Sequence, residues 1–163
     1  MPLLTLVRHA KSSWDFPELD DFARPLNRRG LADCDKMRKH LRERLPAPDR
    51  VLTSDAARAL QTCQVLVEVF ALDAGAVRRV HALYLAPAET VLELLDEHAA
   101  DSADVAVVAH NPGLTDLYNR LLPEPIENLP TFAVARIEVP GGGWSKLPAG
   151  AGKLRDYFAP KTV

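Results

Sequence analysis

Short apolar runs alternate along the chain with longer stretches in which apolar residues recur at every third or fourth position. Apolar runs of about four to eight residues are typical of buried strands, whereas the longer periodic stretches are typical of helices that pack on one face. We therefore expect strands at residues 3–7, 50–53, 77–83 and 105–109, and helices at residues 28–44, 55–70, 87–99 and 112–121.

Capping residues indicate where the expected helices begin. Asn27 and Ser54 carry side-chain oxygens that can accept hydrogen bonds from the first free backbone amides of a helix. Pro87 and Pro112 suit the first helical position, where no amide proton is needed, and Asn111 precedes the second of these prolines as a cap. Each expected helix therefore has a local signal at its start.

Beyond residue 123 the pattern changes to a Pro-rich loop followed by shorter apolar runs. Runs at 132–139 and 144–147, separated by three glycines at 141–143, predict an antiparallel hairpin, and residues 153–158 predict a last strand. Because strands and helices alternate through most of the chain, with no repeat or linker, we expect an α/β fold. It should be a three-layer α/β/α sandwich with a mostly parallel central sheet, in one domain that spans residues 1–163.

Composition narrows the classes of function. The chain has 47% hydrophobic and 26% charged residues and a formal net charge of -2. This near balance of charge argues against broad binding to nucleic acid or to an anionic membrane. It is compatible with a local basic pocket. No apolar run approaches the about 20 residues of a membrane helix, and no signal-peptide pattern is present, so we expect a cytoplasmic protein.

Several titratable residues are interpreted structurally. Cys34 and Cys63 form no cluster with metal-ligand spacing and are expected to be buried, reduced thiols. His81 is expected on a half-exposed strand face, and His40 and His98 on the surface of helices. Acidic residues interleave with the basic residues of the helix at 28–44, which favours a solvated face over a nucleic-acid patch.

Three expected strand-to-helix junctions carry residues that suit an anion. Arg8 and His9 follow the first strand, Arg58 lies near the first turn of the second helix, and His110 follows the most strand-like run. The carboxyl ends of parallel strands meet at one edge of a sheet, so these side chains can converge. Two guanidiniums, one imidazole and the free amides of a helix start make a phosphate cradle, and the second imidazole is a candidate nucleophile.

These residues stand in motifs that resemble the histidine phosphatase superfamily, also called the phosphoglycerate mutase-like fold. Arg8-His9-Ala10 resembles its R-H-G signature, Ser54-x-x-x-Arg58 its S-x-x-x-R pattern, and His110 its second histidine. The resemblance runs from residue 3 to the carboxyl terminus. Residues 24–30 and 110–114 are similar to the SixA type, which is associated with removal of phosphoryl groups from phosphohistidine in proteins.

The resemblance implies a phosphatase that needs neither a metal nor a cofactor. His9 would attack phosphorus and form a covalent phosphohistidine, which water then hydrolyses. Arg8, Arg58 and His110 would stabilise the oxygens of the transferring group, and Asn111 would help to bind the substrate. The implied partner is a phosphate-bearing substrate, with a phosphohistidine protein as the leading candidate.

The chain departs from the family pattern at three points. Ala10 replaces the usual glycine, so the backbone there is expected to have a negative φ, because alanine disfavours positive φ. Asp15 stands where the mutase-like pattern has Asn, and it is interpreted either as a proton donor or as a solvent-facing residue. No residue matches the family's general acid unmistakably; Glu89 is a candidate, with an exposed carboxylate at a helix start as the alternative.

Three other functions remain open at this point. A small-molecule phosphomonoesterase would use the same residues. A phosphoglycerate mutase-like enzyme would need extra elements to enclose its substrate, for which the chain is short. A non-catalytic phosphate-binding module would have no use for a nucleophile such as His9.

Overall fold

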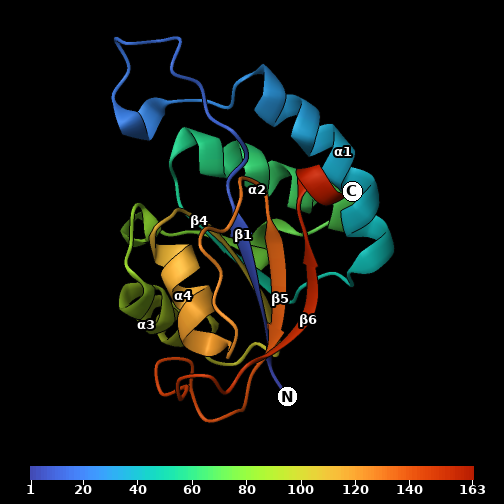
Figure 1. Ribbon diagram of the computed structural model, residues 1–163, viewed down its shortest axis with the longest axis vertical. Coiled ribbons are helices and arrows are strands. Elements are labelled where there is room, and N and C mark those ends of the chain that lie inside the picture. The colour runs from blue at the N-terminus through green and yellow to red at the C-terminus, as the bar shows by residue number, and fades with distance from the viewer.

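The computed structural model describes residues 1–163 and contains one six-stranded sheet, in the order β3-β2-β4-β1-β5-β6 (Figure 1). The four strands β1 to β4 run parallel, β5 runs antiparallel to β1, and β6 runs antiparallel to β5. The strand bounds are Leu3–Arg8 (β1), Arg50–Thr53 (β2), Val77–Arg79 (β3), Asp104–Ala109 (β4), Val134–Glu138 (β5) and Lys153–Phe158 (β6). The prediction of a mostly parallel sheet is confirmed.

Helices cover both faces of this sheet, α1 and α2 on one and α3 and α4 on the other (Figure 1). Their bounds are Arg28–Arg44 (α1), Ala57–Phe70 (α2), Ala88–Ala99 (α3) and Gly113–Leu121 (α4). With helices on both faces of the sheet, the expected three-layer sandwich is present. No helix is both long and apolar enough to cross a membrane.

The core is split by the sheet into two clusters, as the alternation of side chains along a strand requires. In β4, Val105 and Val107 point into the cluster under α3 and α4, whereas Ala106 and Val108 point into the cluster under α1 and α2. Both faces of this strand are buried, which explains why its sequence is continuously apolar instead of alternating. The two cysteines are free and buried in the second cluster, as expected.

The strand expected at residues 77–83 is wrong in its second half. β3 ends at Arg79, and a short 3-10 helix, His81–Leu83, follows. β3 pairs only with β2, and Arg79 lies opposite Thr53, the last residue of β2, so the chain has no strand to pair with beyond this point. His81 therefore lies in an exposed turn, with Nδ1 3.0 Å from Asp55, and not on a strand.

The hairpin expected between residues 132–139 and 144–147 is also wrong. β5 pairs with β6, the last strand predicted, and residues 144–147 form no strand. Trp144 is buried against the end of α3, where its indole nitrogen donates to the carbonyl of Ala99 at 3.1 Å. The apolar side chain of Trp144 therefore packs a loop against α3 and does not belong to a strand.

Two of the expected caps act differently from the prediction. Asn27 accepts a hydrogen bond from the amide of Gly30 at 2.8 Å and caps α1 as expected. Ser54 precedes a helix that begins only at Ala57, and Asn111 binds the amide and hydroxyl of Thr115 inside α4. Both side chains lie at the edge of the sheet where the candidate site is found.

Candidate active site

A cavity of about 460 Å³ opens at the carboxyl edge of the parallel strands. Its wall comprises cationic, imidazole, hydroxyl and carboxylate side chains and two apolar residues: Arg8, His9, Lys11, Ser12, Trp14, Asp21, Arg24, Arg58, Leu85, His110, Asn111 and Thr131. A slightly larger hollow of about 550 Å³ lies near the first residues of β1 and β6, but no histidine, arginine or cysteine lines it. The smaller cavity is the one in which groups capable of chemistry converge.

His9 lies directly after β1 and is 7% exposed. Its Nδ1 is 2.7 Å from the carbonyl oxygen of Ala10, and a carbonyl only accepts, so Nδ1 carries the ring proton. Burial lowers the pKa of His9 to about 3, with smaller contributions from the charges of His110, Arg58 and Arg8. The imidazole is therefore neutral, and the lone pair of Nε2 accepts only a long hydrogen bond, from Nε of Arg58 at 3.4 Å.

Ala10 fits the position at which the family has glycine. Its backbone is not in the left-handed region, and its side chain is fully buried. The amide of Ala10 donates to the hydroxyl of Thr62 at 3.0 Å, which ties the end of β1 to α2. The departure from glycine thus costs no backbone strain.

Arg58 reaches the cavity from the first turn of α2 and is 2% exposed. Its Nε lies 3.4 Å from Nε2 of His9. Its two terminal nitrogens donate to Asp21, Nη1 to the backbone oxygen at 2.6 Å and Nη2 to the carboxylate at 2.9 Å. The guanidinium is therefore held with its Nε edge toward the candidate nucleophile.

Arg8 is the last residue of β1, and only one nitrogen of its guanidinium is bonded within the chain. Nη1 donates to the carbonyl of Leu129 at 3.0 Å, while Nε is buried without a partner. Burial lowers the pKa of Arg8, and the charge of Arg58 lowers it further. A half-buried cation that has a buried, unpartnered donor and lies near a second cation favours binding of an anion.

His110 follows β4, and its ring centroid lies 5.2 Å from that of His9. Its Nε2 is 2.7 Å from the hydroxyl oxygen of Ser54, and its Nδ1 is buried without a partner. Ser54 accepts from the amide of Ala56 at 3.2 Å, and Nε2 is the one acceptor within reach of its hydroxyl proton, so the hydroxyl donates to Nε2. This arrangement leaves a proton on Nδ1, which makes that atom a donor for a bound oxyanion.

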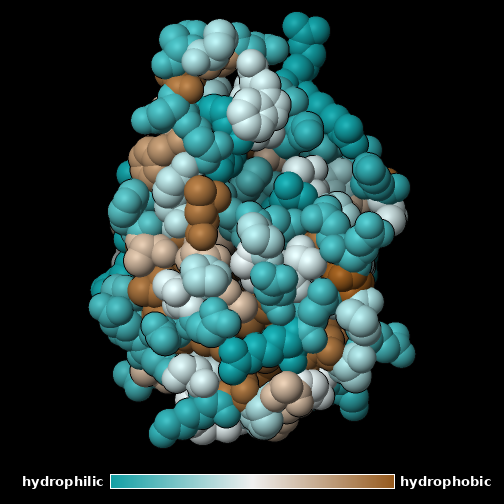
Figure 2. Space-filling model, turned by 60° about the vertical axis from the view of Figure 1, so that its left-hand side comes forward, coloured by the Kyte–Doolittle hydropathy of each residue, from teal (hydrophilic) through white to brown (hydrophobic).

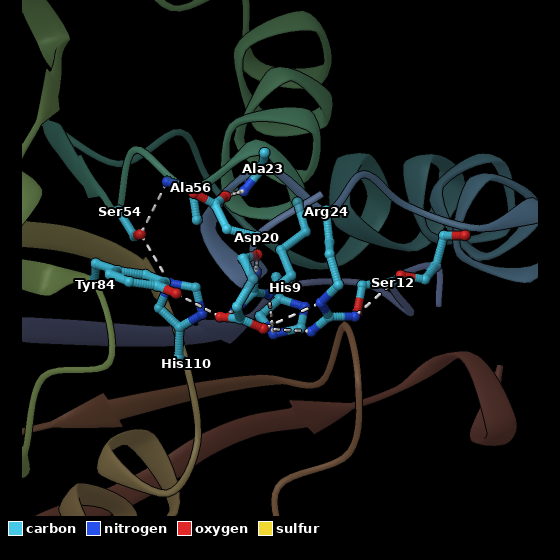
Figure 3. Close-up of polar contacts among 12 residues, drawn as sticks. His9, Ser12, Asp20, Ala23, Arg24, Ser54, Ala56, Tyr84 and His110 are labelled. Carbon is cyan, nitrogen blue, oxygen red and sulfur yellow. Dashed lines mark hydrogen bonds and ion pairs between the residues drawn. The ribbon is translucent and has the colours of Figure 1, made fainter. Parts of the chain in front are cut away.

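Asp21 is the residue of the site that sequence reasoning missed most clearly. Besides Arg58, its carboxylate accepts two bonds from Arg24, at 3.0 and 2.8 Å, and one from the hydroxyl of Tyr84. In the view of Figure 3, Tyr84 and His110 lie on one side of His9, and Arg24 and Ser12 lie on the other. Hydrogen bonds from the phenol and the guanidiniums hold the pKa of Asp21 well below its usual range, so it is ionised.

Arg24 and Tyr84 were also not identified from the sequence. Arg24 is 7% exposed, donates to Ser12 at 2.8 Å, and stacks its guanidinium 3.6 Å from the ring centroid of Trp14. Tyr84 meets the ring of His110 edge to face, with centroids 5.4 Å apart. The length of the loop at 10–27 and its Arg24-Pro-Leu-Asn motif were the only available signals, because Tyr84 belongs to no motif.

The structure brings Arg8, His9, Arg58, His110 and Asn111 to one cavity. The amide nitrogen of Asn111 donates to the carbonyl of Leu129 at 2.9 Å, so this side chain holds the same loop that receives Arg8.

The two candidate proton donors are not brought to this cavity. Asp15 and Glu89 are exposed, Asp15 in the loop after β1 and Glu89 in the first turn of α3, and neither lines the cavity wall. The carboxylate that does line the wall, Asp21, is ionised. No three His, Cys, Asp or Glu side chains come together in a way that could hold a metal ion.

The chain is similar in sequence to a known family and to an uncharacterised relative. The family model of the histidine phosphatase superfamily (branch 1) matches residues 4–83. An uncharacterised protein of Mycobacterium tuberculosis is 32% identical, over 95% of this chain and 100% of its own length.

Solved structures of SixA proteins match the whole fold. A SixA protein of Agrobacterium tumefaciens is 28% identical and superposes with a TM-score of 0.83, covering 98% of this chain and 99% of that chain. A protein histidine phosphatase SixA complexed with tungstate is 23% identical, with a TM-score of 0.79 over 98% of this chain and 97% of that chain. The chain belongs to the histidine phosphatase superfamily, and its fold is of the SixA type.

Proposed function

We propose that this protein is a metal-independent phosphatase that works through a covalent phosphohistidine on His9 and removes phosphoryl groups from phosphohistidine in proteins. The observation that carries the proposal is the position of Nε2 of His9. It is a deprotonated nitrogen, 3.4 Å from Nε of Arg58, and it opens into a cavity that Arg8 and His110 also line. Such an atom suits nucleophilic attack on a phosphoryl group that the neighbouring donors hold.

The reaction has two displacements at phosphorus. In the first, the Nε2 lone pair of His9 forms a bond to phosphorus, and the leaving group departs with the electron pair of its own bond to phosphorus. In the second, a water oxygen bonds to phosphorus, the electron pair of the phosphorus–Nε2 bond returns to His9, and phosphate and a proton leave. Arg8, Arg58 and Nδ1 of His110 supply donors to the three equatorial oxygens in both steps.

Two features support phosphohistidine as the substrate. The cavity holds no carboxyl group that is protonated near neutral pH, since Asp21 is ionised. An imidazole leaves phosphorus more easily than an alkoxide, and it needs a less specialised proton donor. The SixA names of the similar structures favour the same substrate, and one of these proteins was solved in complex with tungstate, an oxyanion shaped like phosphate.

The proposal is tested by incubating the protein, in chelator, with p-nitrophenyl phosphate and with a protein phosphorylated on histidine. We expect turnover of both, faster with the phosphohistidine protein, and its loss in His9→Ala. Tight binding without turnover would instead indicate a phosphate-binding module. Preference for p-nitrophenyl phosphate would favour the small-molecule phosphomonoesterase, and loss of turnover in chelator would reject the metal-independent mechanism.

A further inference from the structure

Two exposed apolar side chains stand at the mouth of an otherwise polar cavity. Trp14 and Leu85 are the only apolar residues of its wall, and they are 73% and 52% exposed. They come from different segments, Trp14 from the loop after β1 and Leu85 from the turn before α3. Figure 2 shows a molecular face on which hydrophilic residues predominate, with smaller hydrophobic areas among them. These two side chains are therefore the apolar surface that the cavity offers to a bound group.

Trp14 is held in place although it is exposed. One face of its indole is covered by the guanidinium of Arg24, 3.6 Å from the ring centroid. That guanidinium is in turn fixed by hydrogen bonds to Asp21, to Ser12 and to the carbonyl of Ser13. The exposed indole is thus a rigid aromatic surface, of the kind that proteins use to contact flat groups at little entropic cost.

Leu85 is held in a conformation that leucine rarely adopts. Its φ is +53°, in the left-handed region that favours glycine and costs other residues about 1 kcal/mol or more. Leu85 follows Tyr84, whose ring contacts His110, and Leu85 lines the same cavity as His9 and His110.

The geometry of displacement places the leaving group near these two residues. His9 is buried at the inner wall, and an in-line transfer puts the leaving group on the opposite side of phosphorus, toward the opening. The cavity of about 460 Å³ is several times larger than a phosphoryl group, whose four heavy atoms fill roughly 120 Å³ if each takes the volume of a water molecule. The outer part of the cavity is therefore free for the group that leaves.

We propose that Trp14 and Leu85 form a leaving-group subsite that holds a flat, uncharged ring bonded directly to the phosphoryl group. This inference rests on the proposed function and identifies the ring as the imidazole of a phosphorylated histidine. Trp14 stacks on the ring while Leu85 packs against it. The charge of Arg24 is paired with Asp21, and its Nε and Nη1 protons go to Asp21, Ser12 and Ser13, so Arg24 contributes to this subsite by holding Trp14.

The test compares two substrates that both contain a phosphorus–nitrogen bond. N-phosphoimidazole carries the ring, and phosphoramidate carries only ammonia in its place. We expect Trp14→Ala to lower the ratio of kcat/KM for phosphoimidazole to kcat/KM for phosphoramidate by about 3- to 10-fold, the size of an aromatic stacking contact. Trp14→Phe should restore most of the ratio.

Two further variants keep the test decisive. Leu85→Gly removes the side chain and relieves the backbone strain, so it should fold and also lower the ratio. Phe16→Ala removes an exposed aromatic residue of the same loop that does not line the cavity, and it should leave the ratio unchanged. An unchanged ratio in both Trp14→Ala and Leu85→Gly would overturn the subsite, even if both rates fell together through displacement of Arg24. Hydrolysis of neither compound by the unmodified protein would instead reject the proposed function.

Discussion

The hydroxyl of Ser54 and Nε2 of His110 lie 2.7 Å apart, and this contact joins two motifs that are 56 residues apart in the chain. Because the hydroxyl fixes the tautomer of His110, it determines whether Nδ1 can donate to the phosphoryl group. We predict that Ser54→Ala lowers kcat with p-nitrophenyl phosphate by roughly 5- to 30-fold, the equivalent of about 1–2 kcal/mol for one hydrogen bond. Ser102→Ala, outside the site, is the control, and wild-type kcat in Ser54→Ala would contradict the assigned tautomer.

The carboxylate of Asp21 forms ion pairs with Arg58 and Arg24. A phosphate bound in the cavity would interact with the same positive charges, and Asp21 would repel it. We predict that Asp21→Asn binds inorganic phosphate more tightly, by roughly 3- to 10-fold, because one repulsive charge is lost near the anion. The inhibition constant of phosphate measures this effect. Asp20→Asn is a matched control, because it removes one negative charge from the neighbouring residue. Its side-chain oxygen can still accept the hydrogen bond from the amide of Ala23. Weaker phosphate binding in Asp21→Asn would show that Asp21 mainly positions the two arginines.

The two buried histidines predict how stability depends on pH. Burial lowers the pKa of His9 to about 3 and that of His110 to about 4, whereas an unfolded histidine titrates near 6.5. Below pH 6.5 the unfolded chain binds protons that the folded chain does not, so the free energy of unfolding falls as the pH falls from 6.5 toward 4. Each residue contributes a slope of at most about 1.4 kcal/mol per pH unit.

This pH effect is measured by urea unfolding between pH 7.5 and 4.5. His9→Asn and His110→Asn should each flatten the decline, because an asparagine takes up no proton in the unfolded chain. A decline of equal slope in the double variant would assign the effect to other groups.

Gly30 allows α1 to lie against the loop that carries the site. A Cβ atom there would come within 2.1 Å of the carbonyl oxygen of Lys11, two residues after His9. We predict that Gly30→Ala lowers the free energy of unfolding by about 1–3 kcal/mol, as overpacking does, and also lowers kcat. Gly75→Ala meets no atom within 4 Å and should change neither quantity. Equal stability of the two variants would mean that the loop moves freely.

Much of the fold could be predicted because local sequence and tertiary structure agree. The continuous apolar run of β4 and the cap at Asn27 are determined by their own neighbourhoods, and both were predicted. Trp144 shows the limit of such reasoning. Its apolar side chain resembles a strand residue, yet its partner is the end of α3, 45 residues away, which no local pattern reveals.

The same distinction applies to the site. His9 and His110 stand at the ends of apolar runs, so parallel pairing of β1 and β4 was enough to bring them together. Asp21 lies inside a long polar loop, and its role depends on Arg58 and Tyr84, 37 and 63 residues away. Carboxylates in such loops are usually solvated, so the sequence offered no reason to select Asp21 over its acidic neighbours.

The most direct test of the mechanism is to trap the phosphorylated enzyme. The protein is mixed with a substrate labelled on phosphorus, quenched in alkali within milliseconds to preserve nitrogen–phosphorus bonds, and mapped by peptide analysis. We predict label on His9, lost in acid, and neither label nor turnover in His9→Ala. Turnover that persists in His9→Ala, or unmodified enzyme throughout rapid turnover, would contradict the covalent mechanism.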